Sequence, residues 1–170
     1  MNYNSVRLFY VEGQTEIHLI KNLKLRGKPK LFNFWTTNVN KIIRTIKSNY
    51  CVCIVYDTDS INSKNIIRFI DSINRIASSC YKVILLQQTD NLEDELKFSC
   101  SCKQNILFNA FNSSGRREFK SQFLKTSNPI EVLNKLGFNM ENLWSKDIIA
   151  DANQLIKKKN IYHGNVHLVP

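Results

Sequence analysis

The sequence predicts an α/β fold, in which a four-stranded, mainly parallel sheet lies between helices and is followed by a helical C-terminal extension. Two observations predict it. Short apolar runs alternate along the chain with stretches whose apolar residues recur every three or four positions, which is the pattern of alternating strands and helices. The run CVCIVY at residues 51–56 has no polar alternation, and this is typical of a strand buried on both faces of a parallel sheet.

The first part of the chain is expected to contain four pairs of a strand and a helix. The strongest helix pattern is at residues 62–79, where isoleucines at positions 66, 67, 70, 73 and 76 form an apolar stripe. Gly13 separates the first strand from its helix, and a Gly-Lys-Pro loop at residues 27–29 precedes the second strand. The expected pairs are residues 6–11 with 14–25, 30–35 with 38–48, 51–56 with 62–79, and 81–87 with 91–100.

The alternating pattern stops near residue 101. Residues 108–114 are rich in Asn and Ser and are expected to form a loop, whereas residues 161–170 are expected to be extended. Helices are predicted over residues 116–125, 129–136 and 141–159. We therefore expect a sheet domain over residues 1–104 and a helical extension over residues 105–170 that packs on the same domain.

Length and charge narrow the class of protein. A chain of 170 residues is long enough for one well-packed domain and short for two. It has no apolar stretch of membrane length and its first residues do not resemble a signal peptide, so we expect a cytoplasmic protein without a membrane partner. The 24 Lys and Arg residues exceed the 14 Asp and Glu residues, giving a net charge of +10. This excess favours nucleic acid as a partner.

Carboxylates gather where the predicted strands end. Glu12 ends the first strand, and Asp57 and Asp59 follow the third. The carboxyl ends of parallel strands meet at one edge of a sheet, where open α/β sheets bind their ligands, so these side chains are expected to lie together. Further acids begin the helices after the first and fourth strands. The complete set, which we name the acidic edge, consists of Glu12, Glu16, Asp57, Asp59, Glu93 and Asp94.

A metal site explains the acidic edge better than helix capping does. Single acids at helix N-termini, such as Glu16, Asp94 or Glu95, are ordinary because they interact favourably with the helix dipole. Several carboxylates at one edge, however, repel one another unless a cation neutralises them. Hard oxygen ligands suit Mg²⁺ or Mn²⁺, which we therefore expect as cofactor.

The order of these acids resembles that of the Toprim domain, which topoisomerases, primases and several nucleases share. The resemblance rests on Val11-Glu12-Gly13 at the end of the first strand and on Asp57-x-Asp59 at the end of the third, and it covers roughly the first hundred residues. The Glu12-x-x-x-Glu16 spacing, together with acids after the fourth strand, is more similar to the overcoming-lysogenization-defect (OLD) and RloB-like branch than to primases.

The resemblance implies a Rossmann-like sheet and a role for each member of the acidic edge. Glu12 would be a metal ligand or a general acid/base, and Asp57 and Asp59 would hold Mg²⁺. A second metal site, as in the OLD-type nucleases, would be completed by Glu16 with Glu93 or Asp94.

The activity expected from this resemblance is metal-dependent hydrolysis of phosphodiester bonds in DNA or RNA. Metals held by carboxylates activate a water molecule and neutralise the charge that develops on the phosphate. The resembled nucleases also use a lysine, for which Lys120 and Lys125 are candidates and Lys120 is the one we name as catalytic.

Basic and aromatic side chains would complete the nucleic-acid contacts. Two roles are open for four aromatic residues, which either stack on bases or lie in the core: Phe111, Phe119, Phe123 and Trp144. Phosphate contacts are expected from Lys28, Lys30, Arg116, Arg117, Lys120, Lys125, Lys157, Lys158 and Lys159.

The resemblance also bears on partners. The ATPase domain usual in the family is not in this sequence, so an ATPase partner is expected to be a separate protein. Small Toprim proteins often belong to anti-phage defence systems, which implies such a role here. The sequence leaves open the choice between DNA and RNA and the oligomeric state, a homo-oligomer included.

Two other functions fit parts of the pattern. Asp57-Thr58-Asp59 is similar to the Asp-x-Asp of haloacid-dehalogenase-like phosphatases, but there the motif follows the first core strand, whereas here a strand and helix precede it. Alternatively, a Toprim-like domain without catalysis would bind nucleic acid or regulate a partner ATPase. A zinc site is not expected, because the two Cys-x-Cys pairs lack the usual Cys-x-x-Cys spacing.

Overall fold

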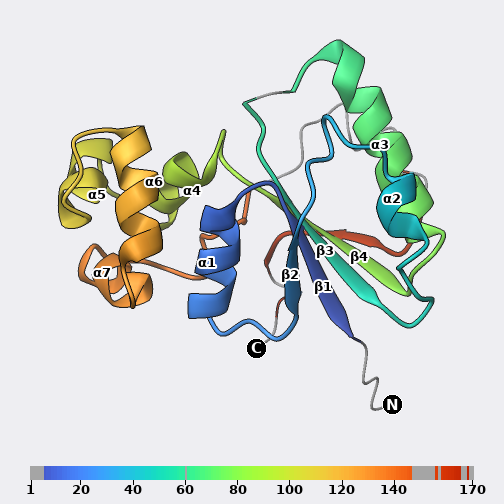
Figure 1. The fold of residues 1–170 in the computed structure, drawn as a ribbon, viewed down its shortest axis with the longest axis horizontal. Coiled ribbons are helices and arrows are strands. Elements are labelled where there is room, and N and C mark those ends of the chain that lie inside the picture. Colours follow the sequence, from blue (N-terminus) through green and yellow to red (C-terminus); the bar gives the residue numbers. More distant parts are fainter. Residues whose placement is uncertain (1–5, 60, 147–155, 157, 166–167, 169–170) are drawn as a thin grey trace.

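The structure, a computed structural model, describes residues 6–59, 61–146, 156, 158–165 and 168. Five strands form one all-parallel, Rossmann-like sheet in the order β2-β1-β3-β4-β5 (Figure 1). The strands are β1 (Arg7–Val11), β2 (Lys28–Leu31), β3 (Cys51–Tyr56), β4 (Lys82–Gln87) and β5 (Ile161–His163). The helices are α1 (Gln14–Asn22), α2 (Asn40–Ile43), α3 (Ser63–Ala77), α4 (Leu92–Ser99), α5 (Gln104–Ala110), α6 (Arg116–Lys125) and α7 (Pro129–Lys135). Within the described part, no helix is long and apolar enough to cross a membrane.

Helices cover both faces of the sheet. Helices α2 and α3 lie over one face, which we name the α3 face, and α1 with α4–α7 lie on the other, which we name the α1 face (Figure 1). Successive residues of a strand point to opposite faces, so Tyr10 belongs to the core of the α3 face and its neighbours Phe9 and Val11 to that of the α1 face. This alternation also decides which face each residue beyond a strand end will meet.

The predicted helix over residues 62–79 is confirmed as α3. Asn62 caps it, since its side-chain oxygen accepts hydrogen bonds from the backbone N–H groups of Lys64 and Asn65. Four of the five isoleucines, at positions 66, 70, 73 and 76, are buried against the sheet, and Ile67 is 64% exposed.

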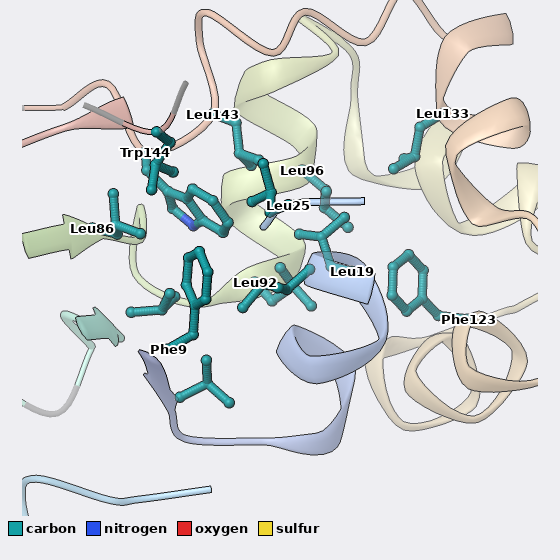
Figure 2. Packing of buried hydrophobic residues seen from close by; sticks show 14 of the residues in the cluster. Phe9, Leu19, Leu25, Leu86, Leu92, Leu96, Phe123, Leu133, Leu143 and Trp144 are labelled. Atoms are coloured by element: carbon teal, nitrogen blue, oxygen red, sulfur yellow. The ribbon is translucent and has the colours of Figure 1, made fainter. Parts of the chain in front are cut away.

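The C-terminal third completes the core of the α1 face. Phe119 and Phe123 of α6 and Trp144 are fully buried in the same cluster as Phe9 of β1. Figure 2 shows Phe123 beside Leu19 of α1, and α6 contacts α1. The aromatic residues considered for base stacking, Phe111 included, are at most 3% exposed and therefore serve the core.

The fifth strand corrects the predicted count of four. Residues 161–163 were expected to be extended, and they pair in parallel with β4, with Ile161 opposite Val83. The Asn160 side-chain amide anchors the approach to this strand by donating to the backbone carbonyls of Ala77, Cys80 and Tyr81, at 2.9, 3.2 and 3.2 Å. A strand of three residues is too short to carry a periodic signal.

Four other elements differ from the prediction. The second helix, expected over residues 38–48, spans only Asn40–Ile43 (α2). The second strand is earlier and shorter, and Phe32 and Phe34 of the predicted strand lie in the core of the α3 face beyond its end. Residues 108–110 belong to α5 instead of a loop, because Leu107 and Phe108 are buried. The predicted helix over residues 141–159 is not found where the structure describes it: residues 141–144 form a turn, and residues 145–146, 156 and 158–159 are not helical. Residues 147–155 and 157 lie outside the described residues.

Candidate active site

Glu12 and Asp57 lie side by side at the carboxyl ends of the neighbouring strands β1 and β3. The pairing of Tyr10 with Ile54 brings the two strand ends together. The Asp57 backbone N–H then donates to Glu12 Oε1 at 3.3 Å, and Asn33 Nδ2 donates to Oε2 at 3.4 Å. The sheet itself therefore juxtaposes these two carboxylates, as the sequence predicts.

The Glu12 carboxyl is poorly solvated. Burial raises the pKa of Glu12 to about 7, although the hydrogen bond from the Asp57 N–H acts in the opposite direction. Repulsion from Glu16 and Asp59 raises this pKa further. Without a cation, part of the Glu12 population is therefore protonated at neutral pH.

The pKa of Asp57 is raised further from its ordinary value than that of Glu12. Burial raises the pKa of Asp57 to about 8. The carboxylates of Glu16, Glu12 and Asp59 raise this pKa further. The ammonium group of Lys120 acts in the opposite direction. Asp57 Oδ1 is buried and has no hydrogen-bond partner among the described residues, so one oxygen of this carboxyl is held away from water without compensation.

Glu16 lies behind this pair on the first turn of α1. It is 4% exposed, and Thr15 Oγ1 donates to its Oε2 at 3.1 Å. A Cβ atom at position 13 would lie 2.6 Å from that oxygen, so Gly13 is needed for the carboxylate to fold back over the helix N-terminus. Burial raises the pKa of Glu16, and the charge of Lys120 lowers it.

Lys120 reaches the acidic edge from α6. Its Nζ lies 3.6 Å from Glu93 Oε1, and the Glu93 side chain is only 1% exposed. Neither carboxylate oxygen of Glu93 has a hydrogen-bond partner in the described part of the chain. Lys125, the other candidate lysine, lies at the end of the same helix. The packing of α6 on α1 thus places Lys120 beside Glu93 at the acidic edge.

Asp94 and Glu95 have other partners. Asp94 forms ion pairs with Lys97 at 2.7 Å and with Arg116 at 2.8 Å, which use both of its oxygens. Glu95 is fully buried and accepts hydrogen bonds from the backbone N–H groups of Thr89, at 2.7 Å, and Trp144. Glu95 therefore fixes two loops, in keeping with its omission from the acidic edge.

Asp59 lies exposed at the rim, on a turn that is braced by the loop after β4. The backbone N–H groups of Thr58 and Asp59 both donate to the Asp90 carbonyl, at 2.8 and 3.1 Å. Thr58 Oγ1 donates to the Gln88 carbonyl at 3.2 Å and accepts from the Asp90 N–H at 3.0 Å. These bonds hold the Asp57-Thr58-Asp59 turn in place over the sheet edge.

Sequence reasoning missed one residue of this edge. Gln88 follows β4 directly, as Asp57 follows β3, and it is 1% exposed with no partner for either polar atom of its side chain among the described residues. The rule that strand ends carry ligands would have found it, but an uncharged amide gives no signal in a search for carboxylates.

The acidic edge thus divides into members that converge and members that do not. Glu16, Asp57 and Glu93 lie near Lys120, Glu12 lies beside Asp57, Asp59 lies at the rim, and Asp94 is held in ion pairs. Among the described residues, no three His, Cys, Asp or Glu side chains are already arranged as a complete ligand set for a metal ion.

A depression lined mostly by polar residues lies next to the acidic edge. Arg116 connects the two, because it lines the depression and forms an ion pair with Asp94 of the acidic edge. Its polar lining consists of amide, hydroxyl and guanidinium groups around α5 and the start of α6, with no acid. The polar lining residues are Gln104, Asn105, Asn109, Ser113, Ser114 and Arg116.

Comparison with known proteins adds no relative: no protein-family model, no curated protein and no solved structure matches this chain.

Proposed function

We propose that this protein is a Toprim-type nuclease that hydrolyses phosphodiester bonds of DNA or RNA at the acidic edge with Mg²⁺ or Mn²⁺. The observation that carries the proposal is the placement of Glu12 and Asp57 side by side with pKa values raised to about 7 and about 8. Crowding carboxylates in this way is unfavourable for folding, so it points to a ligand that compensates the charge.

A divalent cation fits the residues present. Asp57 Oδ1 is a buried oxygen without a partner in the described part, and Glu12 presents a second carboxylate beside it. These two would hold the cation, with Glu16 and Glu93 behind them and Asp59 at the rim. When bound, the cation supplies charge neutralisation at the phosphate and a water of lowered pKa. We leave Asp94 out because its ion pairs occupy both oxygens.

The basic groups would hold the substrate. Lys120 brings a positive charge to the site, and its charge lowers the pKa of both Asp57 and Glu16. Arg117 is exposed on the same helix, and Arg116 lies between the acidic edge and the polar depression. A phosphate chain lying along α6 would therefore meet the cationic groups of Arg116, Arg117 and Lys120.

Cleavage of labelled plasmid DNA, single-stranded DNA and transfer RNA tests the proposal. We expect cleavage of at least one substrate with Mg²⁺ or Mn²⁺, none with chelator, and a loss of at least about 100-fold in the Asp57→Asn variant. Asp71→Asn is the matched control, because Asp71 is an exposed acid on α3, which covers the opposite face. No cleavage with either metal, or equal rates for Asp57→Asn and Asp71→Asn, would refute the proposal.

A binding function without catalysis is favoured by one observation, the net charge of +10. A nucleic-acid-binding or regulatory subunit of a separate ATPase would bind nucleic acid equally well with metal or chelator, and equally well as Asp57→Asn. The same purified proteins distinguish the two functions. An effector role in anti-phage defence belongs to the proposal as well, and is tested by phage plating on cells that express wild-type protein or Asp57→Asn.

A further inference from the structure

Burial of the Gln88 side chain is unfavourable for the stability of the fold. Its side chain is 1% exposed, and within the described residues neither Oε1 nor Nε2 has a hydrogen-bond partner. An amide that is removed from water without compensation lowers the stability of the fold. Buried amides normally have a hydrogen-bond partner, as the preceding residue does: Gln87 Oε1 accepts a hydrogen bond from the Tyr56 hydroxyl at 3.2 Å.

The backbone of Gln88 is fixed beside Asp57. Tyr56 and Gln87 are the last paired residues of β3 and β4, so Asp57 and Gln88 are the next residues on two adjacent strands. The Gln88 N–H donates to the Tyr56 carbonyl at 3.0 Å, which continues the ladder by one residue. Adjacent strands lie about 4.8 Å apart, and an amide side chain spans that distance.

Both side chains also point to the same face. Val55 and Leu86 belong to the core of the α1 face, and side chains two positions apart in a strand share a face. Asp57 and Gln88 therefore both project toward the α1 face, the side on which Glu16 and Glu93 lie. Their unpartnered atoms, Asp57 Oδ1 and the Gln88 amide, therefore lie on the same face at two neighbouring strand ends and form no hydrogen bond with each other.

We propose that the side-chain carbonyl oxygen of Gln88 is an uncharged ligand of the divalent cation that Asp57 binds. This inference rests on the proposed function and names a ligand that the acidic edge does not include. Carbonyl oxygens of Gln are suitable ligands for hard cations. A neutral ligand completes the coordination without adding negative charge to a site where carboxylates already repel one another.

Titration of metal-free protein with Mn²⁺ by calorimetry tests the inference without any activity measurement. We expect Gln88→Leu to bind Mn²⁺ about tenfold or more weakly than wild type, while its metal-free melting temperature stays the same or rises. Gln87→Leu is the matched control: it loses the bond to Tyr56, so its melting temperature should fall and its Mn²⁺ affinity should stay unchanged.

A second variant keeps the test decisive if Gln88→Leu fails to fold. Gln88→Glu retains an oxygen ligand at the same place, so we expect Mn²⁺ affinity at least equal to wild type and a lower metal-free melting temperature. The inference is overturned if wild type binds Mn²⁺ and Asp57→Asn does not, yet Gln88→Leu binds with wild-type affinity. If wild type itself binds no Mn²⁺, the proposed metal-dependent function is refuted, and the inference about Gln88 is refuted with it.

Discussion

The two central carboxylates are placed where they lower the stability of the metal-free fold. A carboxyl whose pKa is higher in the folded than in the unfolded state loses stabilisation as the pH rises, because the unfolded chain releases its proton first. The pKa of Glu12 is raised to about 7 and that of Asp57 to about 8, above ordinary values of 4.5 and 3.8. Stability that is present below about pH 4 should therefore decline until about pH 8 and then level off.

Replacing Asp57 isolates this effect from that of other titrating groups. In chelator, we expect Asp57→Asn to be more stable than wild type by about 1–2 kcal/mol at pH 8.5, and the difference to shrink toward pH 5. Thermal or urea unfolding of both proteins across this pH range measures it. A wild type that is the more stable protein at pH 8.5 would contradict the assignment of a crowded, buried carboxyl.

Lys120 and Lys125 form a natural pair for testing the cation at the site. Lys120→Met should reduce cleavage by at least about 100-fold, since its charge lies against the buried carboxylates. It should also destabilise the metal-free protein by about 1–3 kcal/mol, because Glu93 would remain buried without a counter-charge. Lys125→Met, at the end of the same helix, should leave both quantities near wild type. Cleavage rates measure the effect on activity, and urea unfolding measures the effect on stability. Similar losses in both variants would argue against a specific role for Lys120.

At the scale of elements, α6 positions Lys120 through its aromatic residues. Phe119 and Phe123 are fully buried and pack against each other, with ring centroids 5.6 Å apart. We expect Phe123→Ala to lower the free energy of unfolding by about 3–5 kcal/mol. Leu124→Ala is the control, because Leu124 is 41% exposed and its truncation should cost less than about 1 kcal/mol. Urea unfolding gives both values, and equal, small effects would show that Phe123 is not a core residue.

The elements that sequence could predict are those with strong local patterns. β3 and α6 have the predicted bounds, because an uninterrupted apolar run and a periodic helix are each decided by near neighbours. α5 and β5 were missed because tertiary contacts form them: burial of Leu107 and Phe108 stabilises α5, and pairing with β4 defines β5. Such contacts leave little trace in a single sequence.

Of the candidate site, only the charged residues could be predicted from the sequence. Carboxylates at strand ends are recognisable from residue type and position alone, which is why the sequence points to Glu12 and Asp57. The choice of Lys120 over Lys125 depends on the packing of α6, and the exclusion of Asp94 depends on its ion pairs with basic neighbours. Gln88 leaves no such signal, since its significance lies in burial without a partner among the described residues.

At the scale of the whole molecule, the net charge of +10 predicts how binding responds to salt. Association with DNA or RNA in chelator should weaken steeply between about 50 and 200 mM salt, because phosphate contacts release counterions. Arg117→Ala should weaken binding of all sequences alike and reduce the slope of log affinity against log salt by about 1. Fluorescence anisotropy measures this, and binding that is insensitive to salt would contradict a phosphate-based contact.

The most direct test of the acidic edge as a metal centre is an anomalous difference map from crystals grown with Mn²⁺. We expect one strong peak at the carboxyl ends of β1 and β3, within about 2.5 Å of carboxylate oxygens of Asp57 and Glu12. Crystals of Asp57→Asn should lack this peak. A map in which the wild-type acidic edge holds no Mn²⁺, or in which the ion lies elsewhere on the protein, would contradict the proposed metal-dependent site.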